Sequence, residues 1–309
     1  MFNTTIADID KIDACLIIGA NPRFEASLIN TRLRKRSRLG KVEVGVLGAH
    51  FDLTYPVNHI GTNVESLLDF CEGRHDFCAT LKQAKNPLII VGTSLFERDD
   101  NVALENALNV LSTNLQTPVS ILHSQANQVS ALELGLGEIN LDNLNNSSVI
   151  FLMGADNIEI TNEDAFIVYI GHHSDNNAFK ADVILPSTVF SEKVGTFYNM
   201  EGRPQRTKGA LQSFGLSRDD WQIIRAISEV FEKPLAYNSL NELQDRLTIL
   251  LPSYSNLHFI EESSFGISGI SYNNDIAYVT PLHTVVKDFY MTDTLTSASQ
   301  TMAKCSQSM

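Results

Sequence analysis

The sequence predicts an α/β fold with a doubly wound, mostly parallel sheet, followed by a smaller helical and loop-rich C-terminal region. Short runs of apolar and β-branched residues recur along the chain. They are continuously apolar rather than alternating, which is typical of strands covered by helices on both faces. Segments of helix length separate them, and this alternation of strand and helix favours a parallel sheet.

The predicted strands share an apolar, β-branched composition, and several end in glycine, where a chain can turn tightly. They are 14–19, 42–47, 87–92, 119–122, 149–154, 166–171 and 182–185. The predicted helices are 24–36, 63–71, 101–111, 125–134, 221–231 and 240–250. Asn21 and Pro22 begin the first of these as cap and first helical residue. The alternation of predicted strands and helices ends near residue 215. We therefore expect an α/β domain over 1–215 and a helical region with a C-terminal tail over 216–309.

Composition and charge exclude several classes of protein. Hydrophobic residues make up 43% and charged residues 19%, which is globular rather than disordered. A net charge of -13 disfavours nucleic acid as a partner. No apolar run has the length of a bilayer span, so we expect no direct membrane span. The first residues lack both a secretory signal and an Arg-rich transit peptide, and the four cysteines form no C-x-x-C pair, so a reducing compartment is expected.

The segment 171–207 has the most specific pattern in the chain. A short apolar strand at 182–185 is stopped by Pro186 and leads into a long, polar loop punctuated by Gly195 and Gly202. On an open α/β sheet, ligand sites lie where strands lead into such loops. Glu192, Glu201 and Arg203 are the polar candidates there, and the paired carboxylates could do acid–base work. No nucleophile, histidine base or metal set accompanies them, so we favour loop-fixing salt bridges and hydrogen bonds.

A second candidate is the turn Gly19–Arg23, between the first strand and the first helix. Backbone N–H groups at a helix N-terminus can hold a phosphate. The pattern is neither G-x-G-x-x-G nor a P-loop, and a tight turn that binds nothing is the more common meaning.

Three further patterns have structural interpretations. His172 and His173 are adjacent, and side chains on neighbouring residues of extended backbone point apart, so we expect no metal site. Cys71 and Cys78 are predicted to be structural thiols. A run of basic residues lies at the C-terminal end of the first predicted helix: Arg32, Arg34, Lys35, Arg36 and Arg38. It is either a solvated face favoured by the helix dipole or a docking patch for an acidic partner.

The motifs A-D-V-I-L-P, E-K-x-G-T-F and N-x-E-G-R follow one another within 181–203. In this order they resemble the molybdopterin oxidoreductase family. In that family a similar G-x-N-P turn contacts the pterin cofactor. The resemblance therefore implies vestigial cofactor-binding positions at Gly19, Asn21, Glu201 and Arg203.

Two other segments narrow the resemblance. They are G-H-H-S-D at 171–175 and the tail F-Y-M-T-D…S-A-S-Q-T-M-A-K-C at 289–305. Together they resemble the C-terminal part of the large iron–sulfur subunits of mitochondrial complex I, NADH:ubiquinone oxidoreductase, from about Ile12 to Cys305. The Cys-rich, cluster-bearing half of those subunits has no counterpart here. The metal-ligating residue of the molybdenum enzymes is missing as well.

The resemblance implies a non-catalytic structural subunit, one half of a split subunit, in the peripheral arm of complex I. We expect no catalytic residue, metal or cofactor on this chain, and iron–sulfur clusters on the partner half. The expected partners are that N-terminal half and other peripheral-arm subunits, at the matrix side of the mitochondrial inner membrane. The absence of a transit peptide suggests either that the chain is encoded in the mitochondrion or that import uses another signal. The alternative is a molybdopterin- or nucleotide-binding oxidoreductase component.

Overall fold

A computed structural model of the chain describes residues 1–309 except 138–140, 156–157, 174–175, 261–279 and 309. Contacts group the chain into two compact units. The first comprises Met1–Val129, Tyr198–Gly202 and Ile260–Phe289, and the second comprises Ser130–Phe197, Arg203–Phe259 and Tyr290–Met309. The predicted boundary near residue 215 does not coincide with this grouping and stays a prediction. Among the described residues, no helix has both the length and the apolar character needed to cross a membrane.

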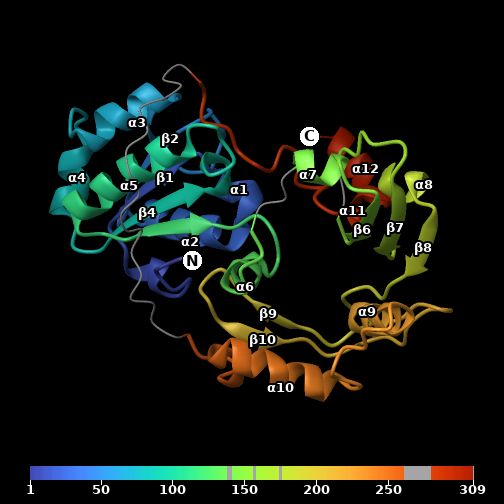
Figure 1. The fold of residues 1–309 in the computed structure, drawn as a ribbon. Coiled ribbons are helices and arrows are strands. Elements are labelled where there is room, and N and C mark those ends of the chain that lie inside the picture. The colour runs from blue at the N-terminus through green and yellow to red at the C-terminus, as the bar shows by residue number, and fades with distance from the viewer. Residues whose placement is uncertain (138–140, 156–157, 174–175, 261–279, 309) are drawn as a thin grey trace. The chain divides into compact units, whose positions relative to one another are not determined.

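The first unit is built on a parallel sheet in the order β3-β2-β1-β4-β5 (Figure 1). Its strands are β1 (Ala14–Ile18), β2 (Glu43–Leu47), β3 (Asn58–Gly61), β4 (Pro87–Gly92) and β5 (Val119–Leu122). The chain builds outward from β1 through β2 to β3, then returns to place β4 on the other side of β1. The order therefore reverses between β1 and β4, which is the switch point where open α/β sheets bind ligands.

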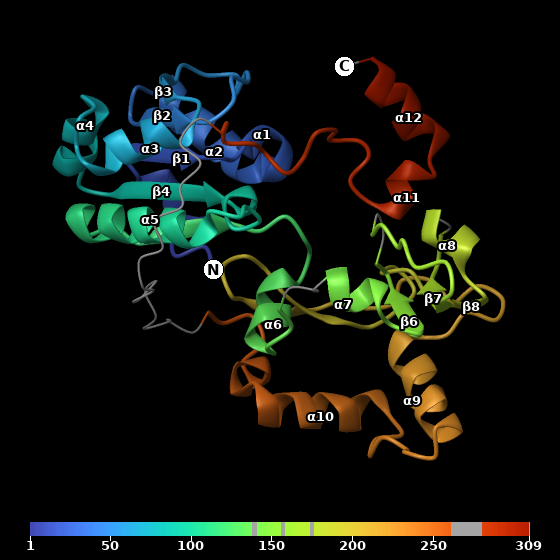
Figure 2. The same cartoon turned by 45° about the horizontal axis from the view of Figure 1, so that its top comes forward.

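Helices cover both faces of this sheet. They are α1 (Pro22–Glu25), α2 (Ser27–Arg38), α3 (Val64–Cys71), α4 (Phe77–Gln83) and α5 (Asn101–Leu115), together with the 3-10 turns η1 (Asp8–Lys11) and η2 (Thr93–Leu95). Figure 2 shows α5 running alongside β4. In β1, Leu16 and Ile18 belong to the core cluster of α3, α4 and α5, whereas Cys15 and Ile17 belong to that of α2. Because successive strand residues point to opposite faces, a strand buried on both must be continuously apolar.

The second unit contains a three-stranded parallel sheet in the order β6-β7-β8. Its strands are β6 (Val149–Met153), β7 (Phe166–Gly171) and β8 (Val183–Pro186), and β9 (Thr196–Tyr198) pairs with β10 (Pro204–Arg206). The helices are α6 (Gln128–Glu133), α7 (Leu141–Asn145), α8 (Asn176–Lys180), α9 (Asp220–Val230), α10 (Leu240–Leu250), α11 (Thr294–Ser297) and α12 (Gln300–Gln307), with the turn η3 (Pro252–Ser255). On one face of this sheet, Ile167 and Tyr169 share a core cluster with Ala178 of α8. On the other face, Val168 and Ile170 share a cluster with Ile223 of α9.

The predicted α/β class with parallel strands is confirmed, and every predicted strand forms. The strands divide between two sheets, however, where the sequence predicted one. The predicted helix 24–36 is two helices, because Ala26 leaves helical geometry with φ -151° and ψ 68°. The C-terminal tail also contains helices: Asp293 caps α11 in a capping box, and the hydroxyl of Ser299 caps α12.

Candidate functional site

The carboxyl ends of β1 and β4 lie unusually close together at the switch point. Gly19 follows β1 with a left-handed φ of +57°, and its N–H donates to the carbonyl of Leu47 over 2.8 Å. A Cβ atom placed on Gly92, the last residue of β4, would lie 2.1 Å from the carbonyl oxygen of Gly19. Glycine is required here because the backbone of one strand occupies the space of a side chain on the other.

The turn after Gly19 uses its polar groups within the chain. Asn21, only 6% exposed, caps α1 through its side-chain oxygen, which accepts from the N–H of Arg23 at 3.2 Å. The N–H of Asn21 itself donates to Glu25 Oε1 at 3.1 Å. The Glu25 carboxylate also accepts backbone hydrogen bonds from Val285 and Val286, and burial raises its pKa above the usual value. An internal carboxylate therefore takes the donors that could otherwise face an anion.

Residues 280–289, the covering segment, return from far along the chain to this edge of the sheet. Figures 1 and 2 show this red segment passing beside α1. Leu282 is 1% exposed, belongs to the core cluster of Leu47 and Leu95, and donates its N–H to the carbonyl of Thr62 at 2.9 Å. Its own carbonyl oxygen would lie 3.7 Å from a Cβ atom on Gly48, the residue after β2. The covering segment thus packs over the ends of the strands.

Two polar side chains after β4 hold the covering segment. Ser94 Oγ lies 3.1 Å from the carbonyl oxygen of Gly19 and 2.6 Å from that of His283, so it links the turn to the segment. Arg98 Nη1 donates to the carbonyl of Pro281 at 3.2 Å. Its guanidinium is held at 2.6 and 2.8 Å by the buried carboxylate of Asp100, and this pair raises the pKa of Arg98.

Glu201 lies elsewhere in the first unit. It is 7% exposed and accepts from the N–H of Ile6 and, at 3.0 Å, from the side-chain amide of Asn199. The N–H of Phe2 donates to the carbonyl of Met200 at 2.7 Å. Glu201 therefore fixes its loop against the N-terminal segment, as the loop-fixing interpretation predicted.

The four predicted cofactor positions do not form one set of contacts. Gly19 and Asn21 share the turn after β1, and Glu201 contacts the N-terminal segment. Arg203 belongs to the second unit, where its guanidinium donates to the carbonyl of His258. Their assignment as vestigial positions stays a prediction.

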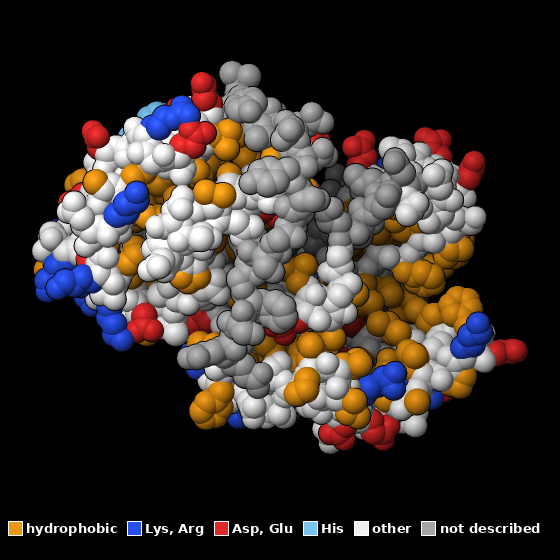
Figure 3. Space-filling view, turned by 60° about the vertical axis from the view of Figure 1, so that its left-hand side comes forward, with side chains coloured by type: hydrophobic (Ala, Val, Ile, Leu, Met, Phe, Trp, Pro, Cys, Tyr) orange, Lys and Arg blue, Asp and Glu red, His pale blue; other side chains and the backbone are white. Residues whose placement is uncertain are grey.

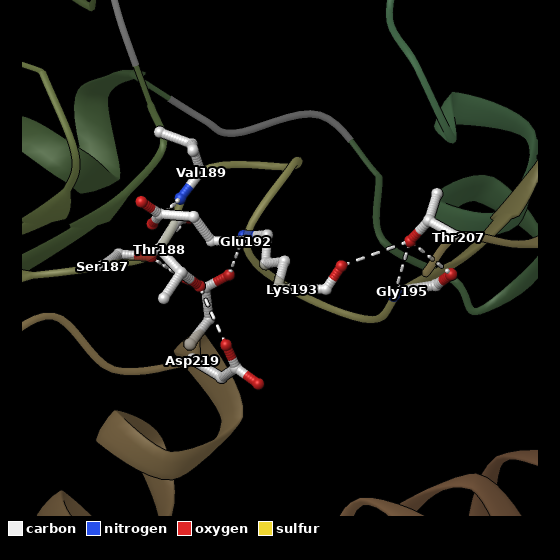
Figure 4. Close-up of polar contacts among 9 residues, drawn as sticks. Ser187, Thr188, Val189, Glu192, Lys193, Gly195, Thr207 and Asp219 are labelled. Atoms are coloured by element: carbon white, nitrogen blue, oxygen red, sulfur yellow. Dashed lines mark hydrogen bonds and ion pairs between the residues drawn. The ribbon is translucent and has the colours of Figure 1, made fainter. Parts of the chain in front are cut away.

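The loop after β8 directs its polar side chains at the start of α9 (Figure 4). Thr188 Oγ1 donates to Asp219 Oδ1 at 2.9 Å. Asp220 accepts from the hydroxyl of Ser187 and pairs with the ammonium of Lys193. These contacts hold α9 at the end of the sheet, so the lysine of the E-K-x-G-T-F motif acts as a structural partner. Glu192 accepts from the N–H of Val189 at 3.2 Å and closes the same loop.

The two adjacent histidines lie closer together than the sequence predicted. Their Nδ1 atoms are 2.9 Å apart and their rings meet edge to face. The prediction assumed an extended strand, but β7 ends at Gly171 and the chain bends at both histidines. No group of three or more His, Cys, Asp or Glu side chains suited to a metal ion occurs among the described residues.

The cysteines and the basic run both make structural contacts. Cys15, Cys71 and Cys78 are buried, and burial raises the pKa of the Cys71 thiol to about 12. In the basic run, Arg32 and Lys35 approach Asp10 at 2.7 and 3.7 Å. Arg36 donates to the carbonyl of Ile12 at 3.0 Å, whereas Arg34 and Arg38 are exposed. Most of this run therefore anchors α2 to the N-terminal turn η1.

Sequence reasoning missed Ser94, Arg98 and Leu282. Ser94 could have been found, because it follows a predicted strand next to Gly92 and the carboxyl ends of parallel strands share one edge. Leu282 carries no such signal, since an isolated leucine in a loop-rich region does not reveal what it packs against.

Two family models match the chain. One, described as molybdopterin oxidoreductase, matches residues 1–230. The other describes the C-terminal region of an NADH-ubiquinone oxidoreductase subunit and matches residues 260–305. Part of the second match, 261–279, lies outside the described residues.

Similar curated proteins bear related names. The NADH-ubiquinone oxidoreductase 75 kDa subunit of Reclinomonas americana is 39% identical over 98% of this chain and 46% of its own length. The NADH dehydrogenase (ubiquinone) iron-sulfur protein 1, mitochondrial, of Solanum tuberosum is 38% identical over 99% and 42%. The mitochondrial 78 kDa subunit of Neurospora crassa is 36% identical over 99% and 43%. The predicted resemblance to the large complex I subunits is confirmed. The chain spans less than half the length of these relatives.

Proposed function

This chain belongs to the molybdopterin oxidoreductase family, and from that premise we propose that it is a non-catalytic structural subunit of the peripheral arm of respiratory complex I. The observation that carries the proposal is similarity over nearly the whole chain to one kind of complex I subunit. We further propose that a separate, Cys-rich polypeptide corresponds to the rest of those relatives. It would carry the iron–sulfur clusters that pass electrons from NADH toward ubiquinone, at the matrix side of the mitochondrial inner membrane.

An exposed apolar surface in the second unit supports a docking role. It comprises Phe190, Leu211, Phe214 and Leu216, of which Phe214 is 86% and Leu216 82% exposed. The loops that carry it are ordered by hydrogen bonds from the N–H groups at 210 and 211 to the carbonyl of Ser191. In Figure 3, hydrophobic side chains also gather at the surface toward the right of the view. Exposed apolar side chains held on ordered loops are a feature of protein interfaces.

Isolation of native complexes from cells that express the tagged chain tests this proposal. We expect the chain to migrate with NADH:ubiquinone oxidoreductase activity and to bring down a separate Cys-rich polypeptide. Stoichiometric iron or molybdenum on the isolated chain would instead favour a redox component. A single polypeptide containing both the Cys-rich half and this sequence would contradict the split.

A matched pair of variants tests the apolar surface. Phe214→Asp places a charge on that surface and should lower the recovery of the partner at least about tenfold, because a buried unpaired carboxylate is costly at an interface. Val110→Asp makes a similar change at an exposed site on α5, outside the proposed surface. Equal recovery with the two variants would exclude this surface as the docking site.

A further inference from the structure

We propose that the covering segment, 280–289, takes the position at the switch point of the first sheet that a cofactor would occupy, so that this chain binds no pterin or nucleoside diphosphate there. The inference rests on the fold and on family membership, and it is independent of the proposed place in complex I. Two observations show that the residues present do not fit the cofactor, and a third concerns the origin of the covering segment.

The first observation is steric. The general rule places a ligand outside the carboxyl ends of the strands that flank the switch point. Here Leu282 is buried at that edge and shares the core cluster of Leu47, at the end of β2, and Leu95, after β4. A ligand there would have to displace a fully buried leucine from the core, together with the hydrogen bond from its N–H to Thr62.

The second observation is electrostatic. A phosphate at the turn after β1 would need free backbone N–H groups. The N–H of Asn21 is already taken by Glu25, and the same carboxylate receives the backbone N–H groups of Val285 and Val286. Glu25 therefore joins the turn to the covering segment and presents a carboxylate where an anion would bind. The carboxylate of Glu25 would repel a phosphate brought to this turn, because both groups carry negative charge.

The third observation concerns the origin of the segment. The molybdopterin oxidoreductase model ends at residue 230, whereas 280–289 falls within the separate C-terminal match at 260–305. Ser94 and Arg98 lie within the molybdopterin match and bond the carbonyls of His283 and Pro281. The part of the chain with the shared fold thus provides the groups that hold a segment from outside it.

Hydrogen exchange and ligand binding on the full chain test the proposal. In the wild-type protein we expect amides of 280–289 to be protected, and no saturable binding of a fluorescent nucleoside diphosphate up to about 1 mM. Leu282→Asp should raise exchange across the segment at least about tenfold while β1 stays protected. His283→Asp adds the same charge to an exposed side chain next to it and should leave exchange unchanged.

A second variant covers the case in which Leu282→Asp fails to fold. Ser94→Ala removes one hydrogen bond to the segment and leaves the buried pair of Arg98 and Asp100 intact, and exchange of 280–289 should rise about fivefold. Two results would overturn the proposal. One is saturable micromolar binding of the nucleoside diphosphate by the wild type while 280–289 remains protected. The other is wild-type exchange across 280–289 as fast as that of the variants.

Discussion

Replacing Gly92 by alanine tests the close approach of β1 and β4 most directly. The added Cβ atom would lie 2.1 Å from Gly19 O and 2.9 Å from Gly19 C. A comfortable carbon–oxygen contact is about 3.3 Å, so the strands would have to separate by roughly 1.2 Å. The obstacle is backbone, which cannot rotate away as a side chain can. The φ of Gly92 is -76°, which alanine adopts freely, so the effect is purely steric.

We expect Gly92→Ala to lower the free energy of unfolding of the first unit by about 3 kcal/mol, at the upper end of overpacking effects. The gain from a less flexible unfolded chain offsets about 0.4–1 kcal/mol of this, so the net loss is about 2–2.6 kcal/mol. With a urea slope of about 2 kcal/mol/M, the midpoint should fall by roughly 1–1.3 M. Hydrogen exchange of β1 and β4 amides against urea measures this unit separately from the second.

Gly40→Ala is the control, because Gly40 has a left-handed φ of +64° and no atom within 4 Å of a Cβ position. It should cost only the conformational penalty of about 1–2 kcal/mol. If Gly92→Ala costs no more than Gly40→Ala, the two strand ends do not approach as described.

Two further predictions concern charge. Burial lowers the pKa of His123 to about 4, so its stabilising contribution is complete above the unfolded pKa of 6.5 and is lost as the pH falls from 6.5 toward 4. Between pH 7 and pH 5 the first unit should lose about 1–2 kcal/mol more in the wild type than in His123→Gln, as measured by urea unfolding at each pH. Asp220→Asn should weaken the contacts to Ser187 and Lys193, cost about 1 kcal/mol, and speed exchange of the amides of 187–195 several-fold. Asp245→Asn, on an exposed face of α10, should change neither measurement, and an equal effect of both variants would contradict the role given to Asp220.

The buried strands could be predicted because burial on both faces leaves a continuous apolar run. Strand β3, with the sequence Asn58-His-Ile-Gly61, was missed because it lies at the sheet edge, is partly exposed and keeps polar residues. The division into two sheets could not be predicted, since each apolar run records only that it is covered. Strand β6 shows the same limit: its five residues are all apolar, yet Val149, Phe151 and Met153 are exposed.

The candidate site could be predicted only where its signals are local. Gly19 and Asn21 stand at a strand-to-helix turn, and the sequence identified both. The contacts that decide what this turn can bind come from Glu25 and from 280–289. Of these, the covering segment is joined to Ser94 over 189 positions of sequence. Pairings over such distances leave no periodic pattern in a single sequence.

The discontinuous make-up of the first unit constrains how it can form during synthesis. Its sheet is complete once β5 has emerged at residue 122, but the carbonyl that Ser94 bonds lies at residue 283. At about 5–20 residues per second, the 161 residues from the end of β5 to position 283 take roughly 8–32 s to translate. For that interval the covering segment is absent from the ribosome-bound chain. The carboxyl ends of the strands are then exposed, and the carboxylate of Glu25 lacks its contacts to Val285 and Val286. A chaperone that recognises these exposed strand ends would find its target only on nascent chains. Truncation before residue 280 would leave the strand ends exposed permanently.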